Sequence, residues 1–87
     1  MDRTVRTERP RIELALIETR RRHPFASYTD ALLTWDAEGR SLRWMALETR
    51  ALTCNTTLWP DGYQPGFKTV GRWRDEAKAA RQAVSAA

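Results

Sequence analysis

The side chains most able to do covalent chemistry in this 87-residue sequence are its single histidine, His23, and its single cysteine, Cys54. A nucleophile of this kind needs a base beside it and a third group that orients the base. The sequence contains no HExxH, CxxC or GxSxG motif and no glycine-rich phosphate loop. We therefore expect an ordinary surface histidine, a buried thiol, and a protein that is not an enzyme and holds no metal or cofactor.

Three acidic residues, Asp30, Asp36 and Glu38, could supply a pair of carboxylates for acid-base chemistry. Asp36 and Glu38 lie at the predicted hairpin turn, however, and acidic residues are common there because they hydrogen-bond the local backbone. We expect these carboxylates to serve the turn.

Arginine dominates the charge of the chain. Lysine and arginine total 15 against 11 acidic residues, a net charge of +4, and 13 of the 15 are arginine. Guanidinium groups hold phosphates and carboxylates bidentately and stack on aromatic rings, so this bias suits a recognition surface. The cluster Arg20-Arg21-Arg22 points to an anionic partner, either nucleic acid or an acidic protein groove. The alternative is a solvated edge that prevents strand aggregation.

Aromatic residues gather in segment 59–67, where two proline-led turns predict an ordered loop. Tryptophan and arginine are the residues that dominate binding hot spots. We expect Trp59 and Tyr63 to contact a partner, with Phe67 in the same loop. Trp73 and either Trp35 or Trp44 are expected in the core.

The pattern along the chain predicts a single α+β domain over 1–87, an antiparallel β-meander of three to four strands packed against one C-terminal helix. Residues 1–9 are predicted to be a mobile arm. The expected strands are 11–19, a hairpin of 31–35 and 40–47 around Gly39, and 51–58. For 11–19 a helix remains open, because Glu, Leu and Ala favour it. Period 3.6 predicts the helix, over 70–86.

Location and assembly follow from what the sequence lacks. It has no apolar run long enough to cross a membrane and no secretion signal at its start, and the lone cysteine suits a reducing compartment. We expect a cytoplasmic protein with no membrane contact. An exposed edge strand would allow a homodimer as well as a monomer.

The predicted sheet and the helix containing Asp75-Glu76-Ala77-Lys78-Ala79-Ala80 resemble two groups of proteins. The first is the sheet-plus-helix DNA-binding module of plant AP2 proteins and integrase arm domains, which implies that Arg40, Arg43 and Arg50 read DNA from the sheet. The second, similar in size and layout, is the group of small phage and mobile-element anti-defence proteins, anti-CRISPRs among them.

The second resemblance implies the leading hypothesis, a stoichiometric inhibitor that occludes a surface of a host defence or nucleic-acid-handling complex. Its partner would be a protein or ribonucleoprotein complex. The alternative is an arginine-rich module that binds nucleic acid directly. The residues expected to bind the partner are Arg20, Arg21, Arg22, Arg40, Arg43, Trp59 and Tyr63.

Overall fold

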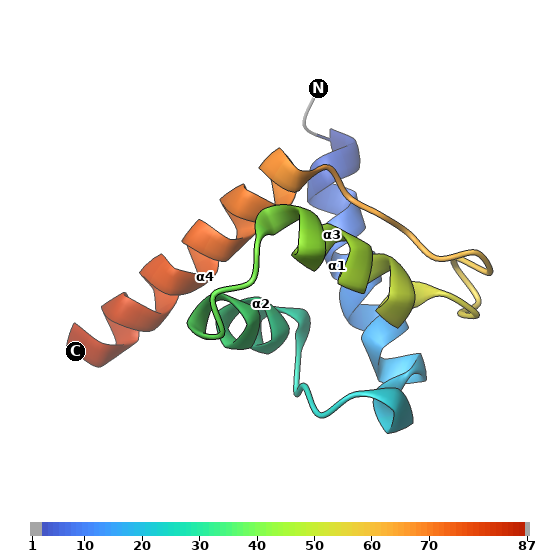
Figure 1. The fold of residues 1–87 in the computed structure, drawn as a ribbon, viewed down its shortest axis with the longest axis horizontal. Helices are drawn as coiled ribbons and strands as arrows, with labels where there is room; N and C mark the ends of the chain where they lie inside the picture. The colour runs from blue at the N-terminus through green and yellow to red at the C-terminus, as the bar shows by residue number, and fades with distance from the viewer. Residues whose placement is uncertain (1–2, 87) are drawn as a thin grey trace.

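The structure is a computed structural model that describes the backbone of residues 3–86 and the side chains of residues 8–83. Four α-helices account for most of the described chain: α1 (Arg3–Glu18), α2 (Tyr28–Ala37), α3 (Leu42–Thr53) and α4 (Phe67–Ala86), with one 3₁₀ turn, η1 (Arg20–Arg22), after α1. Figure 1 shows α3 in front of α1, while α4 runs along the side and projects beyond the other helices.

The predicted α+β fold with a β-meander is wrong, because no strand occurs among residues 3–86. Segment 11–19 belongs almost entirely to α1, segment 31–35 to α2, and segment 40–47 mostly to α3. Segment 51–58 finishes α3 and continues as turns. The sheet layout behind both resemblances is therefore absent from the described chain.

Helix α1 misled the sequence reasoning because it is apolar on two sides. Ile12, Ala15 and Leu16 are buried, whereas Leu14 and Ile17 are exposed. On a wheel these residues surround the helix, and the alternation of Ile12, Leu14 and Leu16 imitates a strand. The helical alternative for this segment is the correct one.

Helix α3 takes the place of the strand expected over 40–47 and of the start of the strand expected over 51–58, the second of which was expected because threonine favours strands in general. Here the hydroxyls of Thr49 and Thr53 donate to the carbonyls four residues earlier, Met45 O and Thr49 O, both at 2.8 Å. This bond lets a buried threonine satisfy its hydroxyl inside a helix. The buried residues of α3 then recur at helical spacing, at Met45, Thr49 and Leu52.

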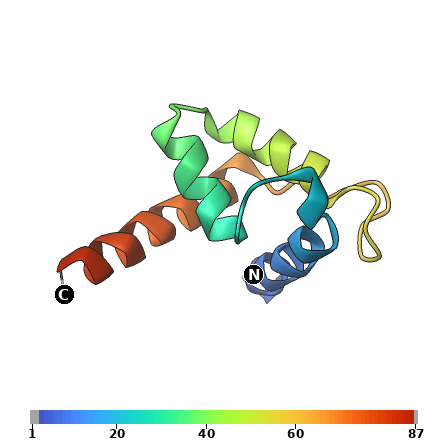
Figure 2. The same cartoon turned by 90° about the horizontal axis from the view of Figure 1, so that it is seen from below.

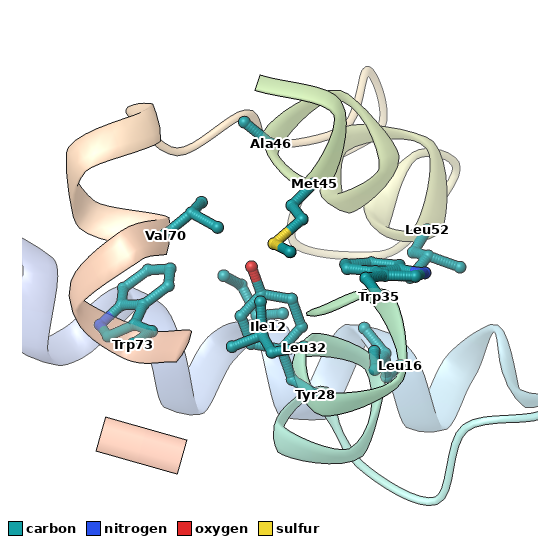
Figure 3. Packing of buried hydrophobic residues seen from close by; sticks show 11 residues of the cluster. Ile12, Leu16, Tyr28, Leu32, Trp35, Met45, Ala46, Leu52, Val70 and Trp73 are labelled. Atoms are coloured by element: carbon teal, nitrogen blue, oxygen red, sulfur yellow. The ribbon is translucent and has the colours of Figure 1, made fainter. Parts of the chain in front are cut away.

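The core lies where all four helices meet (Figure 3). Tyr28 of α2 stands at its centre: its ring meets Trp73 of α4 edge to face, 5.9 Å between centroids, and its hydroxyl lies 2.8 Å from Thr49 Oγ1. The other members of the cluster are Ile12, Leu16, Ala31, Leu32, Trp35, Met45, Ala46, Leu52 and Val70.

The two ends of the predicted domain have clear places in the structure. Residues 1–2 of the predicted arm lie outside the described residues, and from Arg3 onward the segment belongs to α1. Arg9 ties it to the rest, donating to Glu76 of α4 at 3.0 Å and Thr29 of α2 at 2.9 Å. The helix predicted over 70–86 is confirmed, since α4 covers this whole segment.

Candidate nucleic-acid interface

The turn between α2 and α3 is four residues long, 38–41, and is fixed by helix caps at both ends. At the end of α2, Gly39 N donates to Asp36 O and Arg40 N donates to Trp35 O, both at 3.0 Å. With Gly39 at φ +76°, these two bonds form a Schellman cap. At the start of α3, the Ser41 hydroxyl accepts from Trp44 N at 3.1 Å.

Aromatic contacts hold the two helices across this turn. The rings of Trp35 and Trp44 meet edge to face at 5.5 Å between centroids, and Phe25 also meets Trp35 edge to face at the same distance. The guanidinium of Arg40 stacks on Trp44, 4.5 Å from the ring centroid. Figure 2 shows α2 and α3 meeting at the turn and diverging from it. The arrangement is that of a helix-turn-helix pair, two short helices joined by a glycine-containing turn.

The outer side of α3 carries Arg43, Leu47 and Arg50, spaced four and three residues apart and all exposed. This spacing places them on one face, which we call the α3 face. Leu47 is 55% exposed. The opposite side of α3 is in the core, so the α3 face points away from the body of the protein.

A loop and the start of α4 form a wall beside this face. Phe67, 43% exposed, lies under the Arg43 guanidinium at 5.6 Å, and Arg50 Nε donates to Asp61 O at 3.4 Å. Between the helix and the wall is an open hollow of about 350 Å³. Its lining residues are Arg43, Ala46, Leu47, Gln64, Pro65, Gly66 and Phe67.

Several other basic residues of the described chain are neutralised by carboxylates. Arg74 and Lys78 of α4 both reach Asp36, at 3.9 and 3.3 Å. Among the described side chains, no carboxylate lies within ion-pair distance of Arg43 or Arg50. The charge of the α3 face is therefore available to an anionic ligand.

The predicted cluster Arg20-Arg21-Arg22 divides into a structural residue and two surface residues. Arg22 Nη2 donates to Leu52 O at 3.1 Å and to Cys54 O at 2.8 Å, so it caps the end of α3. Arg20 and Arg21 are exposed and line a different open hollow, of about 480 Å³, with Ile17 and Asn55 among its other residues.

The remaining predicted binding residues do not form one surface. Arg40 is engaged by Trp44 and by Glu38 at 3.3 Å, whereas Arg43 lies on the α3 face. Trp59 and Tyr63 stack on each other, 4.9 Å between centroids, and pack against the core. Burial, and less strongly the nearby Glu8, raises the pKa of Tyr63. This aromatic pair anchors the loop, whereas Phe67, expected in the same loop, is the exposed first residue of α4.

The two candidate catalytic residues have separate hydrogen-bond partners. His23 Nε2 lies 3.0 Å from Leu16 O and its Nδ1 accepts from Phe25 N at 3.2 Å, while the Cys54 thiol donates to Ala51 O at 3.1 Å. Asp36 pairs with α4 rather than with another carboxylate. In the described part of the chain, no three His, Cys, Asp or Glu side chains gather as a metal site requires.

Sequence reasoning missed Leu47 and placed Arg50 on a sheet. The signal that would have found the α3 face is the helical period over 42–53, in which Met45, Thr49 and Leu52 alternate with Arg43, Leu47 and Arg50.

No helix of the described chain has the length and apolar character needed to span a membrane. A comparison with known protein families found no match, and searches of curated proteins and of solved structures found none either.

Proposed function

We propose that the protein binds duplex DNA through the α3 face, with α3 acting as the second helix of a helix-turn-helix pair. The observation that carries the proposal is a stripe of two arginines around a leucine on the exposed side of a helix that follows a rigid four-residue turn. The major groove of B-form DNA is wide enough to admit such a helix. The major groove of duplex RNA is deep and too narrow to admit such a helix, which favours DNA as the ligand.

Each residue of the α3 face has a role suited to its chemistry. Arg43 lies in the first turn of α3, where recognition helices contact bases, and an arginine fork matches the two acceptors of guanine. Leu47 offers an apolar contact to a thymine methyl group, and Arg50 offers a charge to a phosphate. Lys68 and Arg72, exposed on the first turns of α4, would add phosphate contacts beside Phe67.

The test is fluorescence anisotropy with labelled duplex DNA at about 50 mM and about 200 mM salt, where phosphate contacts predict a steep loss of affinity. Replacing both arginines, Arg43→Gln with Arg50→Gln, should weaken binding at least roughly tenfold and flatten the salt dependence. The matched control is the pair Arg20→Gln with Arg21→Gln. It removes the same charge from two exposed arginines that line a different hollow, and it should lower affinity much less.

Two results would overturn the proposal. One is the absence of binding to duplex DNA at the lower salt concentration. The other is an equal loss of affinity in both pairs of substitutions, which would mean that net charge alone attracts the DNA.

The predicted inhibitor is the second candidate function, and the apolar content of the hollow favours it. Leu47 and Phe67 expose large apolar side chains next to Arg43, a mixture typical of the centre of a protein interface. This hypothesis expects a stoichiometric protein partner in a pull-down from host lysate, lost on Leu47→Asp. If the pull-down yields no such partner and DNA binding weakens as salt rises, the results favour the first candidate.

A further inference from the structure

Helix α1 presents an apolar stripe to solvent on the side opposite its core face. Pro10, Leu14 and Ile17 form the stripe, at spacings of four and three residues, and all are exposed, Leu14 at 56% and Ile17 at 66%. Ile12 and Leu16, on the other side of the helix, fill the core. No contact within the described chain requires this second apolar face, and exposed stripes of this kind mark interaction surfaces.

The charged residues along one edge of the stripe identify what covers it. Arg11 and Glu18 are seven residues apart, two helical turns, and therefore lie on the same flank of α1. Both are exposed. Arg11 reaches Glu8 only at 3.5 Å, and Glu18 accepts from Thr57 through its backbone N and hydroxyl, at 3.1 and 2.9 Å. Leu14 stands between them, three residues after Arg11 and four before Glu18.

We propose that a second copy of this chain covers the stripe, with the two α1 helices antiparallel and crossing at Leu14. A two-fold axis at this residue brings the same flank of both helices together. Arg11 then lies beside Glu18 of the partner subunit, and Glu18 beside Arg11 of the partner subunit. The surface is thus complementary to itself in charge as well as in apolar character. This inference does not rest on DNA binding by the α3 face.

The dimer is expected to be weak. Three apolar side chains and two charged residues per copy make an interface smaller than the roughly 1,200–2,000 Å² of stable complexes. For a transient interface of this size we expect a dissociation constant on the order of 10–100 μM. Analytical ultracentrifugation over this concentration range should show a monomer–dimer equilibrium.

Charge reversal tests the predicted register. Arg11→Glu alone places two pairs of acidic residues together across the interface, and Glu18→Arg alone places two pairs of basic residues together. Each purified variant should therefore dimerise at least roughly tenfold more weakly than the unchanged chain. An equal mixture of the two variants restores opposite charges at both contacts, so the mixture should form heterodimers. Dimers that form equally well in each variant alone would overturn the register.

Replacing an apolar residue of the stripe by a polar one tests the stripe itself. This substitution does not involve Glu18, which also holds Thr57. Leu14→Gln should reduce dimerisation at least roughly tenfold, with circular dichroism verifying an unchanged helix content. Leu47→Gln is the matched control, since Leu47 of α3 is equally exposed, and it should leave the dimer intact. A purely monomeric unchanged chain at about 200 μM, or equal effects of the two substitutions, would contradict the proposal.

Discussion

At the scale of single residues, the hydroxyl groups of Tyr28 and Thr49 form a polar contact inside the core. Both residues are fully buried, and Thr49 also donates to Met45 O. Thr49→Val leaves the Tyr28 hydroxyl buried without its partner and should lower the free energy of unfolding by about 1–3 kcal/mol. Tyr28→Phe leaves Thr49 its bond to Met45 and should cost only about 0.5–1.5 kcal/mol. Urea unfolding of both variants measures these two losses of stability. Equal losses, or a larger loss in Tyr28→Phe, would argue against this arrangement.

Tyr28 also gives the fold a dependence on alkaline pH. Burial raises the pKa of its phenol far above the usual value of 10.0, and this effect exceeds the opposing influences of Thr49 and Arg9. Below pH 10 the phenol is neutral in both the folded and the unfolded chain, so the stability is fully present. Above pH 10 the unfolded chain ionises first, and stability should fall by up to about 1.4 kcal/mol per pH unit. Urea midpoints at pH 8, 10 and 11 should fall less steeply in Tyr28→Phe.

At the scale of elements, two glycines with positive φ allow the cost of backbone strain to be compared with the cost of a steric clash. Gly39, at φ +76°, has no atom within 4 Å of an added Cβ, whereas at Gly62, at φ +84°, an added Cβ would lie 2.5 Å from Arg50 O. Gly39→Ala should cost about 1 kcal/mol from strain alone. Gly62→Ala should cost clearly more, about 2–4 kcal/mol, because the loop must also move away from α3. Equal costs in urea unfolding would mean that the loop is not held against α3.

The elements also show what the sequence could predict and what it could not. Gly39 was correctly expected to take a positive φ, but a helix cap and a hairpin need the same residue, so the glycine could not decide between them. The threonines of 51–58 and the two apolar sides of α1 favour strands in the sequence, whereas within α3 the buried hydroxyl of Thr49 is satisfied by Met45 O, one turn earlier in the same helix. Helical spacing in α4 was readable because its buried residues, Val70, Trp73 and Ala77, lie on one side only.

The sequence singles out arginine for the candidate site, but it does not show which arginines are free of partners. That depends on residues distant in sequence. Arg22 donates to the carbonyls of Leu52 and Cys54 at the end of α3, 30 and 32 residues away, whereas no described carboxylate lies within ion-pair distance of Arg43. Likewise, Trp59 and Tyr63 stack on the body of the protein and leave Phe67 as the exposed ring. Neither outcome could be inferred before the helices were placed.

At the scale of the whole molecule, the two proposed surfaces lie on opposite sides. Figure 1 shows α3 in front of α1, and Figure 2, turned by 90°, shows the two helices on opposite sides of the protein. The buried residues of each helix point inward, so the α3 face and the α1 stripe point away from each other. A dimer joined through α1 therefore carries its two α3 faces outward on opposite sides. Because the two faces point in opposite directions, they cannot both contact neighbouring half-sites on one duplex.

This geometry predicts that the dimer tethers two separate DNA duplexes. Beads carrying one duplex should retain a second, fluorescent duplex when the unchanged protein is present above its dimerisation constant. Leu14→Gln should abolish this retention while its binding to a single duplex, measured by anisotropy, stays close to that of the unchanged chain. Arg43→Gln with Arg50→Gln should abolish both. Retention that survives Leu14→Gln would place two DNA-binding surfaces on one chain, and retention that never occurs would mean that dimerisation and DNA binding exclude each other.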